Sequence, residues 1–87
     1  MLDHFKDHAH SLSSPAHDAS AIVPDDGADL QHTSRAIYVG SGGDLRLRMA
    51  SGTEITFTAV ASGMIYPLRA ARVMASGTTA AGLVALW

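Results

Sequence analysis

Two histidines and two aspartates near the N-terminus are spaced as the ligands of a divalent metal would be. On a helix, His4 and His8 share one face at i, i+4, and Asp3 and Asp7 lie beside them. Zinc binds imidazole and carboxylate groups of this kind. A working site also needs surrounding groups that orient the imidazole rings, and this polar stretch offers none. We therefore expect a solvated or protein-bound segment and predict no metal ligand.

Catalytic groups are scarce in the rest of the chain. From residue 35 onward there is no histidine, and Asp44 and Glu54 are the only carboxylates. A serine or threonine nucleophile needs a nearby base, and the nearest histidine in sequence is His32. A glycosidase-type pair needs two acids flanking a cleft, whereas Asp44 follows a glycine turn and Glu54 starts a predicted strand. We predict no catalytic residue and no enzyme activity.

A glycine-rich segment and three aromatic residues are the remaining candidates for binding. Gly40-Ser41-Gly42-Gly43 lacks the lysine and the following helix of a phosphate-binding loop, so a hairpin turn is the better interpretation. Tyr38, Tyr66 and Trp87 could stack on a sugar, or could fill the core or a subunit interface. We favour the second interpretation and predict no cofactor.

The length and composition favour a small subunit that is stabilised by partners. A chain of 87 residues forms one domain at most, and it buries only about 60% of the surface that its unfolded form exposes. It contains no cysteine, so partner subunits are the simplest remaining source of stability. We therefore expect a homo-oligomer.

Charge is divided unevenly along the chain. Residues 1–34 hold six aspartates, one lysine and all five histidines, whereas residues 35–87 hold five arginines and two acids, so the net charges are −5 and +3. The acidic part either contacts neighbouring subunits or is simply solvated. So few basic residues do not suit a nucleic acid, and no apolar run reaches the roughly 20 residues of a membrane span. The N-terminus lacks the features of a secretory signal, so we expect synthesis in the cytoplasm without export.

The pattern of turns divides the chain into an arm and a domain. Residues 1–34 are predicted to form a polar, acidic, histidine-rich arm that is extended or becomes ordered on assembly, with a first β-like tract at 21–23 and a turn at 24–27. Residues 35–87 are predicted to form a compact β domain. Six or so short strands at about ten-residue spacing predict an all-β fold, a small antiparallel sandwich or barrel.

The clearest local prediction is an antiparallel hairpin of residues 44–49 and 54–60. Both segments alternate between apolar and polar residues, which predicts these inward side chains: Leu45, Leu47, Met49, Ile55, Phe57 and Ala59. In a simple register Arg46 or Arg48 would lie near Glu54. Pro67 favours an edge position for 64–68. The tract 81–87 is apolar on both faces, which is typical of a central strand or of one covered by another subunit.

An ordered series of segments in residues 35–87 resembles a known family. The segments are Arg35-Ala36-Ile37-Tyr38-Val39-Gly40, Gly43-Asp44-Leu45-Arg46, Ile65-Tyr66-Pro67-Leu68-Arg69, Arg72-Val73-Met74-Ala75-Ser76-Gly77-Thr78-Thr79-Ala80-Ala81-Gly82 and Leu83-Val84-Ala85-Leu86-Trp87. Together they resemble the spike base proteins of gene transfer agents, which are phage-derived particles that carry bacterial DNA between cells. Related short proteins occur in tailed phages.

The resemblance implies a structural role in a virion. Members of that family sit at the fivefold vertices of the capsid and form the base of a head spike, whose fibre contacts the host's surface polysaccharide. By this likeness we expect a pentamer that binds the capsid protein and a spike fibre protein. The composition of the acidic arm leads to the further hypothesis that the arm is the capsid anchor. The alternative is a small carbohydrate-binding module that contacts the host polysaccharide directly through Tyr38, Tyr66 or Trp87.

Overall fold

The computed structural model describes residues 16–87, so the histidines and aspartates around His4 and His8 lie outside the described residues. Within the described range the chain forms strands and turns without a helix. The strands are β1 (Ala19–Ala21), β2 (Ala36–Ser41), β3 (Gly43–Met49), β4 (Glu54–Val60), β5 (Met64–Tyr66), β6 (Ala70–Val73) and β7 (Ala81–Leu86).

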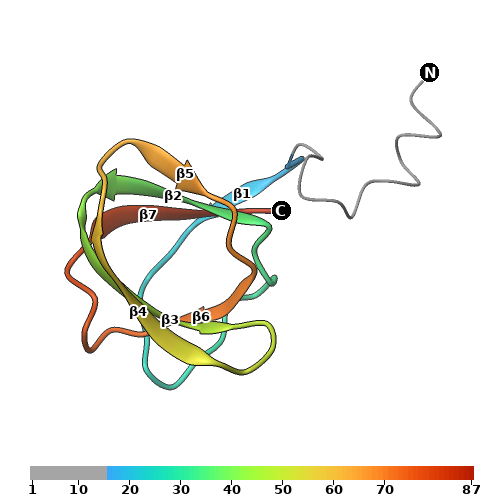
Figure 1. The fold of residues 1–87 in the computed structure, drawn as a ribbon. Coiled ribbons are helices and arrows are strands. Elements are labelled where there is room, and N and C mark those ends of the chain that lie inside the picture. The colour runs from blue at the N-terminus through green and yellow to red at the C-terminus, as the bar shows by residue number, and fades with distance from the viewer. Residues whose placement is uncertain (1–15) are drawn as a thin grey trace.

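The strands form two sheets that pack face to face. Sheet A has the order β1-β7-β2-β5 and sheet B the order β4-β3-β6, and every pair of neighbours is antiparallel. Figure 1 shows them as two layers, with sheet A above sheet B. The core between the layers is aliphatic and includes the fully buried Ile37, Val39, Leu45 and Leu47. The predicted small antiparallel β-sandwich is therefore confirmed.

The predicted hairpin is present as β3 and β4. Arg48 lies opposite Glu54, and Leu47 lies opposite Ile55. Leu45 and Leu47 are both 0% exposed, because alternate residues of a strand point to the same face of its sheet. The expected contacts with Glu54 form as well: Arg48 lies 2.8 Å and Arg46 3.5 Å from its carboxylate oxygens.

The prediction of inward residues in β4 is confirmed for Phe57, which packs against the core, but not for Ile55 and Ala59, which are exposed. Ile55 is 44% exposed because β4 is an edge strand, and Ala59 is exposed while Val60 is 8% exposed. A bulge between Gly43 and Leu45 shifts the pairing, and Ala59 there adopts a positive φ of 56°. A single extra residue reverses which side chains face the core, and the sequence pattern alone did not reveal it.

The segment 40–43 is a corner between the sheets, and the predicted hairpin turn is wrong. β2 pairs with β7 and β5, whereas β3 pairs with β4 and β6. The chain leaves sheet A at Gly42 and enters sheet B at Gly43. A Cβ on Gly42 would collide with the carbonyl oxygen of Val60, and one on Gly43 would lie 2.7 Å from Thr79 Oγ1. The glycines permit this close approach of three backbone segments.

Strand β7 is central, which is one of the two positions predicted for it. It lies between β1 and β2, and Leu83 and Ala85 are 3% and 2% exposed on its inner face. Val84 and Leu86 alternate with them on the outer face and are half-buried. At the edge of the same sheet lies β5, as Pro67 predicts.

Residues 17–34 of the predicted arm pack along the sandwich in an extended conformation. Residues 19–21 pair with β7 as strand β1, two residues earlier than the predicted tract 21–23. Ile22 is 8% exposed within the core, and its amide donates to the carbonyl of Leu83. The predicted turn after Pro24 is closed by a bond from the Gly27 amide to Asp25 Oδ1. The division of the chain at residue 35 therefore marks a change of composition, and packing continues across it.

Ser34 fixes the junction between this extended segment and the sandwich. It is 0% exposed and is the only buried polar side chain among the described residues. Its hydroxyl donates to the carbonyl of Leu68 at 2.7 Å and accepts from the amide of Ala70 at 3.0 Å. Its amide donates to the carbonyl of Ala70. One residue thus satisfies the backbone where the chain passes from β5 in sheet A to β6 in sheet B.

We predict that Ser34→Ala lowers the free energy of unfolding by about 1–3 kcal/mol, because it leaves buried backbone groups of Leu68 and Ala70 without a partner. Urea denaturation of the two proteins measures the difference. Ser51→Ala is the matched control, since the Ser51 hydroxyl is exposed and contacts only Thr53 Oγ1 at 3.3 Å. Equal losses in the two variants would contradict the role assigned to Ser34.

Candidate functional site

The two carboxylates of the β domain lie at opposite ends of the β3–β4 hairpin. Asp44 Oδ1 accepts from the amide of Ala59 at 3.1 Å and supports the bulge. Glu54 lies at the other end, opposite Arg48. The acids therefore do not flank a common cleft, and each already has a structural partner. The arrangement offers no acid–base pair.

Glu54 belongs to a network of charges on the outer face of sheet B. Its carboxylate accepts from Arg48 and also contacts Arg46. The hydrogen bond from Arg48, together with the positive charge of that residue, lowers the pKa of Glu54. Arg72 binds Asp29 at 2.8 Å and donates to the carbonyl of Asp26. Strand β6 thereby holds the loop of residues 25–29 against the sheet.

The three aromatic candidates are in separate places. Tyr38 is 36% exposed on the outer face of sheet A. Tyr66 lies opposite Ile37 on the inner face, and its hydroxyl accepts from the amide of Ala61 at 2.8 Å. The ring of Trp87 stacks on His32, with 4.5 Å between ring centroids. A shared sugar-stacking platform is therefore not formed, and of the three residues Trp87 is the one that lines the cavity described next.

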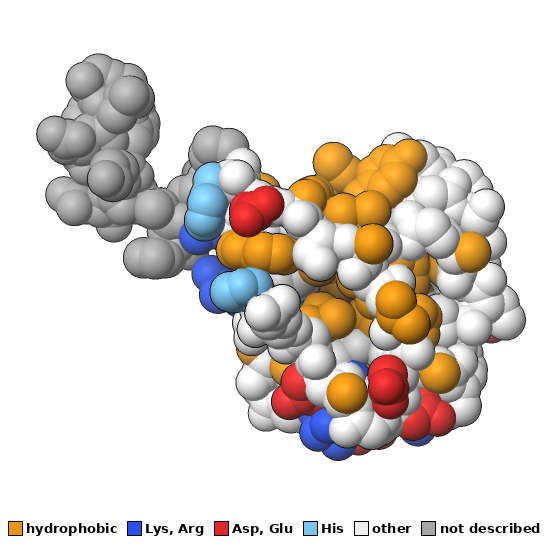
Figure 2. All heavy atoms as spheres, turned by 180° about the vertical axis from the view of Figure 1, so that it is seen from behind, with side chains coloured by type: hydrophobic (Ala, Val, Ile, Leu, Met, Phe, Trp, Pro, Cys, Tyr) orange, Lys and Arg blue, Asp and Glu red, His pale blue; other side chains and the backbone are white. Residues whose placement is uncertain are grey.

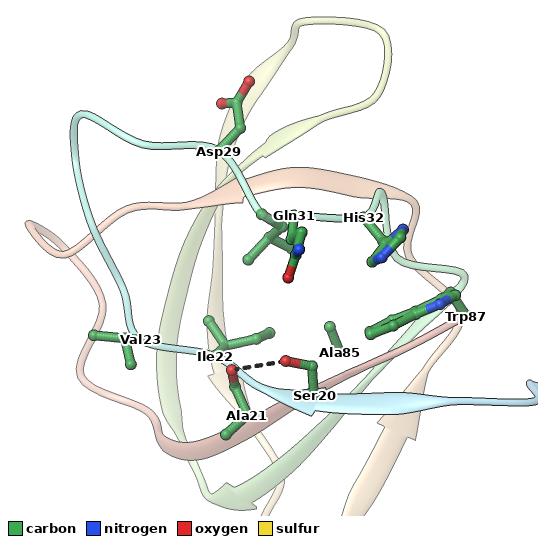
Figure 3. Close-up of a pocket in the computed structure, with 10 residues that line it drawn as sticks. Ser20, Ala21, Ile22, Val23, Asp29, Gln31, His32, Ala85 and Trp87 are labelled. Atoms are coloured by element: carbon green, nitrogen blue, oxygen red, sulfur yellow. Dashed lines mark hydrogen bonds between the residues drawn. The ribbon is translucent and has the colours of Figure 1, made fainter.

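That cavity, of about 240 Å³, opens at the edge of the sandwich between β1 and residues 29–32. Figure 3 shows Trp87 and His32 on one side of it, Ile22 and Val23 on the other, and the Gln31 side chain pointing inward. The Asp29 carboxylate points away from it (Figure 3) and is held by Arg72. The stacked rings of Trp87 and His32, together with the hydroxyl of Ser20 and the amide of Gln31, suit a small uncharged ligand or a partner's side chain.

Sequence reasoning missed this cavity because its walls are far apart in the chain. Residues 20–32 meet Ala85 and Trp87 only because β1 pairs with β7. The backbone of Trp87 reinforces that pairing: its carbonyl accepts from the amides of His17 and Asp18, and its amide donates to the carbonyl of Asp18. The β-like character of residues 21–23 was the one usable signal, and it did not identify the partner strand.

Across residues 16–87 there is no group of three or more histidine, cysteine or acidic side chains that could hold a metal ion. The same part of the chain contains no helix that is long and apolar enough to cross a membrane.

The chain is similar to a protein of known structure. It matches a chain in the capsid of a native gene transfer agent (GTA) particle computed with C5 symmetry, with 43% sequence identity and a TM-score of 0.79. The match covers 95% of this chain and 96% of that chain. No protein-family model matches this sequence, and no curated protein matches it.

We predict that Glu54→Gln lowers stability at neutral pH and that this loss disappears in acid. The folded-state pKa of Glu54 lies below its ordinary value of about 4.5. The ionised carboxylate therefore stabilises the folded protein fully at pH values above about 4.5. The contribution fades as the pH falls through the folded pKa. It is small because the pair is exposed to solvent. Urea midpoints measured between pH 7 and pH 3 test this, and a difference that is constant with pH would contradict it.

Proposed function

This chain belongs to the family of the gene transfer agent capsid protein that it matches, and from that membership we propose that it is a structural protein of a virion rather than an enzyme. The carrying observation is that the likeness extends over nearly the whole of both chains. The geometry agrees with it, since Asp44 and Glu54 hold the hairpin together at opposite ends.

The finer role that we propose is the base of a head spike. The protein would occupy a fivefold vertex of the capsid, bind the capsid protein there, and carry the spike fibre that contacts the host. Two observations support this role: the ordered segments of residues 35–87 that resemble spike base proteins, and the C5 symmetry of the particle that contains the matched chain. The protein would then form a pentamer.

Formation of a pentamer would also compensate for the limited stability of so small a domain. Among the described residues the core cluster consists of eleven buried side chains, all of them alanine, valine, leucine or isoleucine, and the chain has no disulfide to supplement it. Small domains of this kind gain stability when neighbouring subunits bury further apolar surface. In a ring around a fivefold axis each copy has two neighbours, so each copy would bury apolar surface at two contacts.

A second candidate function is a small carbohydrate-binding module, and the cavity beside Trp87 favours it. The half-buried ring of Trp87 and the neutral polar groups of Ser20 and Gln31 could receive one sugar unit. Binding of the purified protein to host capsular polysaccharide, weakened by Trp87→Ala, would support the module. If the protein binds polysaccharide only in complex with the fibre, the connector is supported.

We predict that particles made without this protein contain intact capsids that lack the projections at their vertices. A connector is added to a capsid and is not needed to close it, so capsid yield is expected to stay unchanged. Electron microscopy of purified particles measures both properties, and host adsorption should fall. A complete loss of capsids, or vertices identical to the wild type, would contradict the proposed role.

We predict that deletion of residues 1–15 prevents attachment to capsids while the remaining chain still folds, because we propose that this segment is the capsid anchor. The deletion stops there because residues 17–22 belong to the sandwich through their bonds to Trp87 and Leu83. Incorporation into particles and the thermal unfolding midpoint are measured together. Normal decoration of capsids by the shortened protein would show that the anchor lies elsewhere.

A further inference from the structure

The outer face of sheet A carries a continuous row of apolar side chains. Ala21 lies opposite Val84, Val84 opposite Tyr38, and Tyr38 opposite Ile65, so the row crosses all four strands in register. A second row runs beside it, because Leu86 lies opposite both Ala19 and Ala36. The intervening residues Ile37, Val39, Leu83 and Ala85 face the core.

These rows are open to solvent in the single chain. Ile65 is 57% and Tyr38 36% exposed, Ala21 is exposed, and Val84 and Leu86 are half-buried. None of the seven side chains in the two rows is charged or carries an amide. A sheet that faces water on one side alternates apolar and polar residues, and sheet A does not.

Sheet B does show the ordinary pattern, which makes the difference informative. Its outer face carries Arg46, Arg48, Arg72 and Glu54, paired with each other or with Asp29. Figure 2 shows a group of acidic and basic side chains along the lower end of the molecule and a smaller charged group at the upper left, with orange side chains over much of the upper part. The outer face of sheet B is therefore suited to contact with water, and the outer face of sheet A is suited to contact with an apolar partner.

We propose that the outer face of sheet A, defined by the two rows above, is the surface on which a neighbouring copy of this chain packs around the fivefold axis. This inference rests on the proposed function. The partner is a second copy because the matched chain belongs to a capsid computed with C5 symmetry, in which each chain is repeated around the fivefold axis in the same surroundings. An uncharged face also suits a neutral patch on such a copy better than an acidic or basic partner.

The symmetry adds a geometric requirement. A closed ring of five is built from heterologous contacts, in which one patch meets a different patch on the next copy. The rows on sheet A would therefore contact another part of the neighbour, and the Tyr38 residues of adjacent copies would not meet. A twofold dimer would instead bring identical residues together near its axis.

The test compares oligomeric mass for Ile65→Asp and Thr56→Asp. Both substitutions place one carboxylate on an exposed residue of an edge strand, the first on sheet A and the second on sheet B. Native mass spectrometry across a range of concentrations is expected to give a five-membered ring for the wild type and for Thr56→Asp. Ile65→Asp is expected to weaken assembly at least about tenfold, which corresponds to 1.4 kcal/mol. Circular dichroism shows whether each variant is folded.

Val84→Thr is the second variant in case Ile65→Asp fails to fold, because threonine keeps the β-branched shape and adds one hydroxyl to the same row. A ring that persists undiminished in every folded variant of these rows would overturn the proposal and leave the spike-base role intact. A wild type that stays monomeric up to millimolar concentration would overturn it too. Imaging of particles that lack the protein decides the spike-base role separately.

A single introduced cysteine distinguishes a ring from a twofold dimer, since the chain has no cysteine of its own. In the ring, Ile65→Cys is expected to be protected from maleimide at least about tenfold relative to the dissociated protein, and to form no disulfide between copies. Rapid labelling of the assembled protein, or a symmetric disulfide dimer at this position, would contradict the proposed packing.

Discussion

The buried hydroxyl of Ser34 meets the main constraint on this fold, which is that the chain must pass between two sheets without leaving backbone groups unpaired. An interior passage exposes amides and carbonyls to an apolar environment, and each unpaired group costs free energy. Ser34 serves Leu68 and Ala70 at once, at the passage from β5 to β6. It also ends the extended segment and precedes β2, so the same residue positions both sheets.

The opposite end of the sandwich is closed by backbone contact around two glycines. The Gly42 amide donates to Ser62 Oγ, and the carbonyl of Asp44 accepts from the amides of Thr79 and Ala80. Three passages between the sheets therefore meet at one corner, where side chains larger than hydrogen do not fit. Closure at both ends substitutes for the disulfides that small domains often use, and it leaves the outer faces of the sheets free for other roles.

Sequence patterns predicted the features that depend on neighbouring residues. The β3–β4 hairpin, the Glu54 ion pairs and the edge position of β5 follow from alternation, a short turn and one proline. Long-range features were missed. The bulge at Ala59 depends on a bond from its amide to Asp44, and the cavity at Trp87 depends on β1 joining β7. The glycines of residues 40–43 predict a hairpin turn but form a corner between the sheets, because glycines in sequence do not reveal which segments approach them.

The two outer faces also explain why β7 is apolar throughout. Its inner residues, Leu83 and Ala85, complete the core of the single chain, so the core alone would be satisfied by polar residues at the alternate positions. Val84 and Leu86 occupy those positions instead, in line with Tyr38, Ala36 and Ile65 on neighbouring strands. Solvation would favour polar residues there, as it does on sheet B. A strand that is apolar beyond the needs of its own fold is what the proposed packing of a second copy on sheet A requires.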